Sequence, residues 1–275
     1  MKEAYLTIDD SPTKHTSDFV DWLSARDIPA ILFCVGSSYE DLGIPCEGIE
    51  QNPEPIRKAI DHGYLIGNHT YNHVRFSETP IEEMKEQILK TERVIDRLYK
   101  EAGRSRSHKV FRFRDIDRGC GTWVVDFNQT DAYTPVIQDL FWKGVNLNPI
   151  TPTAQDFEKK EQFQEFLKSE GFSADLYKDI NFDWYQNTEM AEALDSLYTY
   201  STSDWMINPD FKEFSKDWLY NSEAALKKKI EEDEWLGYEG SANIILAHDH
   251  NNLFEHTIAL IEHIVTKQGI KFREY

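Results

Sequence analysis

The sequence predicts an α/β protein built around a parallel sheet or barrel, and two patterns support this prediction. Short apolar runs alternate with amphipathic stretches of helical period through Leu98, which is typical of repeated strand–helix–strand units. The same rhythm returns after Gly240. Because right-handed crossovers bring the carboxyl ends of all the strands to one side, polar residues that follow strands should gather there.

In the first part of the chain, short runs rich in β-branched and aromatic residues predict the strands, and apolar residues three and four apart predict the helices. The continuous apolar run Ala30–Val35 indicates a strand that is buried on both faces. The expected strands are residues 4–8, 30–35, 64–67 and 110–113; the expected helices are 16–25, a second one opened by Asn52-Pro53 and stopped by His62-Gly63, and 80–102.

Between Gly121 and Gly240 this rhythm is lost, and we expect a single domain with a decorated or inserted region there. Within that region, helical patterns occur at Ala154–Ser169, Thr188–Tyr198 and Ser222–Asp233. The domain is then expected to close with a strand at Ser241–Ala247, a helix at Leu253–Thr266 and a short strand at Ile270–Phe272.

Composition excludes some partners. The chain has 275 residues and a formal net charge of −19, with 49 acidic against 30 basic side chains. This balance argues against nucleic acids and anionic membrane surfaces, because both require local positive charge. Its cysteines, Cys34, Cys46 and Cys120, form no disulfide framework, which is compatible with a reducing compartment. Without a signal peptide or membrane-spanning run, the sequence predicts a cytoplasmic protein, or a secreted one if a leader was trimmed; it does not predict an oligomeric state.

The first candidate for chemistry is the pair Asp9-Asp10 at the end of the first strand. Adjacent carboxylates at a buried strand end repel and need a metal ion, an arginine or a shared proton, although a solvated turn is the simpler interpretation. His69 and His73 follow another strand, four residues apart, and would lie on one face if the chain between them were helical. One carboxylate with two imidazoles indicates a divalent metal with open positions, as in catalytic sites.

Hydrolysis at such a site requires a base for the water and an acid for the leaving group. The carboxylate of the Asp pair that does not bind the ion is the candidate base. His248, at the end of the strand Ser241–Ala247, is the candidate acid, and its alternative role is that of a hydrogen-bonded histidine at the edge of the core.

Three motifs together resemble the polysaccharide deacetylases, the NodB-homology enzymes of carbohydrate esterase family 4. They are Thr7-Ile8-Asp9-Asp10, His69-Thr70-Tyr71-Asn72-His73 and Leu246-Ala247-His248. The resemblance fits through Leu98 and from Ser241 onward, and only loosely between them. It implies a deformed (β/α) barrel that hydrolyses N-acetyl or O-acetyl groups of a GlcNAc-containing glycan, so that the expected partner is an N-acetylated carbohydrate.

The resemblance also implies roles for individual residues. Asp9 corresponds to the base and His248 to the acid that protonates the amine, while Leu246 would line the pocket for the acetyl methyl group. The implied metal ligands are Asp10, His69 and His73. The implied ion is zinc, with cobalt, nickel, manganese or iron as alternatives.

The family's third motif, Arg-x-Pro-aromatic, is altered here. Arg112 takes the place of the arginine that orients the Asp9 carboxylate, Arg114 stands where proline is expected, and Asp115 where the aromatic residue is expected. A backbone N–H at Asp115 can still serve as the family's oxyanion contact. In the competing register, Arg114 takes the arginine role.

The family's fourth motif is an Asp-Trp pair, and the chain offers three candidates. The resemblance favours Asp183-Trp184, in which Asp183 would orient His248 and Trp184 would wall the site. Ser203-Asp204-Trp205 is the second candidate and Lys216-Asp217-Trp218 the third.

Two other functions compete with glycan deacetylation. The altered third motif leaves room for a metal-dependent hydrolase of another amide or a cyclic imide. A non-catalytic carbohydrate-binding protein on the same scaffold is the second alternative, and the presence of all five central residues of the three motifs counts against it.

Overall fold

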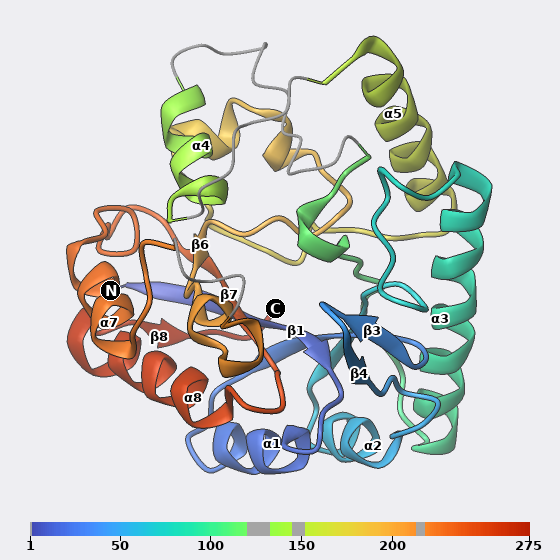
Figure 1. Cartoon of the computed structure of the whole chain (residues 1–275), viewed down its shortest axis with the longest axis horizontal. Helices are drawn as coiled ribbons and strands as arrows, with labels where there is room; N and C mark the ends of the chain where they lie inside the picture. The colour runs from blue at the N-terminus through green and yellow to red at the C-terminus, as the bar shows by residue number, and fades with distance from the viewer. Residues whose placement is uncertain (1, 120–132, 145–151, 213–217) are drawn as a thin grey trace.

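The computed structural model describes residues 2–119, 133–144, 152–212 and 218–275, and its elements surround one central strand, β1 (Glu3–Ser11) (Figure 1). Residues 4–11 of this strand are buried, because elements cover both of its faces. Its even-numbered apolar residues pack into one core cluster, whereas Tyr5 packs into another. The predicted α/β architecture is confirmed.

The main sheet has the order β5-β2-β1-β7-β6, and β8 pairs with the start of β1. All of these pairings are parallel. The strands added to β1 are β2 (Ala30–Cys34), β5 (Leu65–Asn68), β6 (Tyr200–Ser201), β7 (Asn243–His248) and β8 (Lys271–Phe272). Because β1 is central, its carboxyl end lies between the ends of β2 and β7.

One face of the sheet is covered by helices that the apolar spacing predicted. Figure 1 shows α8, α1, α2 and α3 following one another along the outside of the sheet. Their apolar sides join the strands in the first core cluster. These helices are α1 (Thr16–Ser24), α2 (Glu54–Asp61), α3 (Ile81–Glu101) and α8 (Phe254–His263), with α7 (Glu223–Glu232) packed against α8. None of the helices in the described ranges is long and apolar enough to cross a membrane.

The other face is covered by the middle of the chain. There, α6 (Asp183–Gln186) and the residues around it pack against Tyr5 and the inward side of β7 in the second core cluster. The described helices of this region also include α4 (Thr134–Trp142) and α5 (Ala154–Ser169), and α5 has the predicted bounds.

Single-residue bridges extend the sheet beyond β5 and curl it toward a barrel. Phe111 pairs with Asn68 on one side and with Asp195 on the other. The chain then runs from Asp195 to β6, which pairs with β7 at the opposite edge. The described part of the sheet is therefore curled. Its two edges are connected at Phe111 by isolated bridges rather than by a continuous strand.

Two local predictions were wrong, and one element was missed. Val110–Phe113 is not a strand, because it contributes only the bridges at Phe111. Thr188–Tyr198 is not a helix: it holds only the 3-10 turn η2 (Glu189–Ala191), after which Ser196 donates its N–H to the Phe111 carbonyl across the bridge. The hairpin of β3 (Tyr39–Asp41) and β4 (Ile44–Cys46) was not predicted.

Candidate active site

Asp9 and Asp10 both reach the carboxyl-terminal edge of the sheet, although neighbours on a regular strand point to opposite faces. The register of β1 shifts between Ile8 and Ser11, and Asp10 has a left-handed backbone with φ 68°. This irregularity allows both carboxylates to lie near one imidazole. His69 Nε2 is 3.9 Å from Asp9 Oδ2 and 3.3 Å from Asp10 Oδ1.

Asp10, His69 and His73 form a group whose ligand atoms lie within 4.8 Å of one another, and all three residues are buried. Asp10 Oδ1 is 3.0 Å from His73 Nε2. The segment between the histidines is not helical, although a helix there was the expected way to place both rings on one face. Left-handed backbone at Thr70 (φ 70°) and His73 (φ 53°) turns the loop instead, and the two rings still converge.

The acceptor atoms of these residues suit a divalent cation. Asp10 Oδ1 is buried without a hydrogen-bond partner, which is costly for a carboxylate oxygen unless a cation meets it. His69 Nδ1 lies 2.8 Å from the Arg112 carbonyl, to which it can only donate, so in the neutral ring Nε2 presents a lone pair toward Asp10. Two imidazoles and a carboxylate are ligands that zinc and similar ions accept.

The protonation states of Asp10 and His73 also favour a cation, whereas for His69 burial lowers the pKa but Asp9 and Asp10 outweigh it and raise it. Burial alone would raise the pKa of Asp10, but His73, His250 and His69 together lower it well below its ordinary value. Burial lowers the pKa of His73, and Asp10 offsets this only in part. An ionised carboxylate and a neutral imidazole are the forms that bind metals.

Arg112 lies beside Asp9, as the first of the two registers predicts. Its side chain is fully buried, and Nη1 donates to Asp9 Oδ1 and Thr7 Oγ1, each at 2.8 Å. Its Nε donates to the Ser196 carbonyl at 2.8 Å. Arg114 instead contacts the His73 carbonyl and Asp41, so it does not take the place beside Asp9.

His248 ends β7 and is held by Asp204. Its Nδ1 lies 2.7 Å from Asp204 Oδ1, and its backbone N–H donates to Asp204 Oδ2 at 2.8 Å. Thr257 donates to the same Oδ2 at 2.9 Å. Burial lowers the pKa of His248, but the charge and hydrogen bond of Asp204 outweigh it and raise this pKa to about 9. The pairing with Asp204 therefore favours the protonated imidazole at neutral pH.

The prediction that Asp183 orients His248 was wrong. Asp183 is exposed at the start of α6, and Trp184 is only 2% exposed and stacks on Phe182, so it offers a ligand almost no surface. The second candidate, Asp204, holds this place because it follows β6, which pairs in parallel with β7.

Two further predicted residues lie at the ends of their motifs. Leu246 is 5% exposed and precedes His248 by two residues, so both side chains lie on the same side of β7. The Asp115 side chain is exposed and pairs with Arg75 at 2.9 Å. Of the third Asp-Trp candidate, Asp217 lies outside the described residues, as does Cys120.

A family model described as "Polysaccharide deacetylase" matches residues 1–113. Over this stretch, which is less than half of its length, the chain is similar to the polysaccharide deacetylase family. The matched segment contains five of the site residues, namely Asp9, Asp10, His69, His73 and Arg112.

Similar sequences include named deacetylases. The chain is 29% identical over 150 residues to a peptidoglycan-N-acetylglucosamine deacetylase of Bacillus cereus, a match that covers 54% of this chain and 50% of that protein. It is 23% identical over 180 residues to the chitin deacetylase of Colletotrichum lindemuthianum, covering 66% and 63%. The chain thus spans about half the length of the first relative.

Solved structures of polysaccharide deacetylases share the fold. The chitin deacetylase of Colletotrichum lindemuthianum superimposes with a TM-score of 0.56 at 15% identity, over 98% of this chain and 84% of that one. A family 4 carbohydrate esterase from Streptomyces lividans gives 0.52 at 16% identity, over 98% and 90%. A family 4 pseudoenzyme from Bacillus anthracis gives 0.52 at 15%, over 98% and 63%, so the fold alone does not decide activity.

Sequence reasoning missed two residues next to the family's motifs. His250 lies two positions beyond His248, and its Nε2 is 2.6 Å from Asp10 Oδ2. The repeated histidine in His248-Asp249-His250 was the available signal. Tyr39 packs its ring against that of His73, with 4.7 Å between centroids, and only the unpredicted hairpin brings it there.

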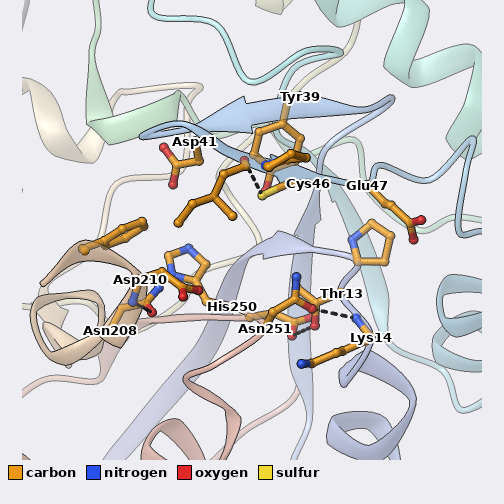
Figure 2. A pocket seen from close by; sticks show the side chains of 15 residues that line it. Thr13, Lys14, Tyr39, Asp41, Cys46, Glu47, Asn208, Asp210, His250 and Asn251 are labelled. Carbon is orange, nitrogen blue, oxygen red and sulfur yellow. Dashed lines mark hydrogen bonds between the residues drawn. The ribbon is translucent and has the colours of Figure 1, made fainter.

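A pocket of about 300 Å³ opens beside these two residues (Figure 2). The β3–β4 hairpin forms one wall and the 3-10 turn η4 (Pro209–Phe211) another, while the loops after β1 and β7 form the floor. Its charged lining is mostly acidic: Asp41, Glu47, Asp210 and Asp249, with Lys14 as the basic side chain.

Proposed function

We propose that this chain is a metal-dependent hydrolase that removes acetyl groups, chiefly N-acetyl groups, from a GlcNAc-containing glycan. The observation that carries the proposal is the convergence of Asp10, His69 and His73 around a buried carboxylate oxygen that has no hydrogen-bond partner. The relatives named above as deacetylases of peptidoglycan and chitin support the choice of bond.

Asp10, His69 and His73 would hold the ion, and we propose zinc. A divalent ion there would polarise the acetyl carbonyl and make water a better nucleophile at neutral pH. The other groups are arranged for proton transfer. Asp9, whose Oδ1 is fixed by Arg112, would take the proton from the attacking water through Oδ2, which lies 3.9 Å from His69 Nε2.

His248 would give a proton to the amine nitrogen as the carbon–nitrogen bond breaks. The hydrogen bond from Nδ1 to Asp204 leaves the protonated Nε2 available for this transfer. Asp9 and His248 are partners in the β1–β7 register, so base and acid are on adjacent strands. Leu246, on the same side of β7, would contact the acetyl methyl group.

The pocket would accept the sugar next to the reacting group, and its acidic lining favours a neutral or cationic glycan over an anionic polymer. We therefore propose chitooligosaccharides, whole or partly deacetylated, as better substrates than peptidoglycan fragments that carry free carboxylates.

Metal content and acetate release test the function together. The purified chain should contain one divalent ion and release acetate from N-acetylated chitooligosaccharides, and a chelator should abolish the release until zinc is restored. Protein that binds the ion but releases nothing from any acetylated sugar would contradict deacetylation.

The alternative of amide or cyclic imide hydrolysis is supported by the altered third motif, because Arg114 and Asp115 replace the family's proline and aromatic residue. Ring opening of a cyclic imide, followed by ultraviolet absorbance, with no acetate from the sugars, would favour it. Binding of glycans without any hydrolysis in added zinc or cobalt would favour a carbohydrate-binding protein.

A further inference from the structure

His250 contacts the oxygen of Asp10 that the metal-ligand group does not use. Asp10 Oδ1 lies near His69 and His73, whereas Oδ2 is 2.6 Å from His250 Nε2. His250 is not part of the group of ligand atoms that lie within 4.8 Å of one another. It therefore contacts the carboxylate at Oδ2, whereas the candidate ion would be bound at Oδ1.

A second contact determines which nitrogen of His250 carries hydrogen. The Asn208 side-chain oxygen accepts the backbone N–H of Asp210 at 3.0 Å, which identifies the other end of the amide as Nδ2. This Nδ2 lies 3.0 Å from His250 Nδ1. Because an amide nitrogen only donates, His250 Nδ1 must accept, and the ring hydrogen is on Nε2, directed at Asp10.

The ring is also held by packing. Phe211 meets the His250 ring edge-on, with 5.4 Å between centroids and an interplanar angle of 77°. Phe211 and Asn208 belong to the same turn, at η4, which also forms a wall of the pocket. Figure 2 shows Asn208 beside His250 at this wall. One short segment thus sets both the orientation and the tautomer of the imidazole.

We propose that His250 is a positioning residue, which holds Asp10 Oδ2 through Nε2–H so that the carboxylate offers only Oδ1 to the ion. This inference rests on the proposed metal-dependent function. Asp10 needs such support, because its backbone is left-handed and lies at an irregularity of β1, where the strand does not fix the side chain. Removing the hydrogen-bond partner of a metal ligand typically lowers the metal affinity about 10- to 100-fold.

The test measures the Zn²⁺ affinity of the whole chain by competition with a chromophoric chelator. His250→Ala should weaken binding about 10- to 100-fold. His250→Gln should stay closer to the wild type, because its amide N–H can still reach Asp10. Asn208→Ser keeps an oxygen for the Asp210 N–H but loses the donor to His250, and should weaken binding by less than His250→Ala. His256→Ala is the matched control, since His256 is a half-buried histidine paired with Glu223.

The Co²⁺-loaded proteins provide a readout of the ligand set. If His250 only positions Asp10, the visible d–d spectrum should be the same in the wild type and in His250→Gln, whose amide N–H can still hold Asp10 Oδ2, whereas His250→Ala frees Oδ2 to reach the ion. A changed spectrum in both variants would make His250 a direct ligand and overturn the inference, as would an unchanged affinity in His250→Ala.

Two outcomes remain distinct from these. A wild-type chain that binds no metal would refute the proposed function rather than the role of His250. If circular dichroism finds His250→Ala unfolded, Asn208→Ser decides: weaker Zn²⁺ binding than the wild type supports the inference, and equal binding overturns it.

Discussion

The Asp204→Asn substitution tests the proton-donating half of the site. Asp204 accepts four hydrogen bonds, two from His248, one from Thr257 and one from the Trp205 backbone N–H. An amide accepts through only one of its two ends, so either the backbone or the ring of His248 loses its acceptor. The charge of Asp204, the largest of the causes that raise the pKa of His248 to about 9, is removed as well, while those of Asp10 and Asp9 remain.

The magnitude follows from that shift. A full return to the ordinary value of 6.5 would be worth about 3 kcal/mol and sets the scale of the expected effect. At pH 8 the imidazole would be about 90% protonated in the wild type and about 3% in the variant, a loss of about thirtyfold in the acid form. Since activity needs the protonated form, its decline with rising pH should move from near 9 toward 6.5.

Initial rates of acetate release from a chitooligosaccharide, measured across this pH range at saturating zinc, provide the assay. Asp183→Asn is the matched control, because Asp183 is the exposed acid of the other Asp-Trp pair and should leave the profile unchanged. If Asp204→Asn retained the wild-type decline of activity at alkaline pH, Asp204 would not be the residue that keeps His248 protonated.

Three further substitutions test the remaining roles. Asp10→Ala should abolish metal binding, so that one bound equivalent by elemental analysis would exclude Asp10 as a ligand. Asp9→Asn should keep the ion while kcat falls about 10²- to 10⁴-fold; turnover like that of the wild type would reject the base. Arg112→Ala leaves the buried Asp9 carboxylate without its arginine partner and should lower the free energy of unfolding, measured in urea, by about 3–5 kcal/mol. Arg26→Ala, at an exposed pair with Glu262, should cost about 1 kcal/mol or less; equal effects would contradict the importance of burial.

The α/β fold and the convergence of Asp10, His69 and His73 could be predicted because their signals are local. Each strand of the first part is a short apolar run, and the residues after it are fixed by the chain itself, as at Asp9-Asp10 and His69. The place of Arg112 could be predicted in the same way, because it directly follows the apolar pair Val110-Phe111 and Phe111 bridges to the sheet.

The partner of His248 could not be chosen from the sequence, because an Asp-Trp dipeptide contains no information about tertiary contacts. What selects Asp204 over Asp183 is the two-residue strand β6, which is too short to be recognised as a strand. The contact of His250 with Asp10 depends on the turn at Asn208, and no pattern of hydropathy predicts it.

The segment from Asp195 to Asp204 has a consequence for exchanging parts between relatives. Within ten residues it supplies the carbonyl that holds Arg112, the bridge to Phe111 and the carboxylate that holds His248. The proposed base and acid are thus both held by one irregular segment of backbone. A chimera that replaces the middle of the chain to acquire a new sugar preference must keep this strip in register, or it will lose turnover before any change in specificity can be measured.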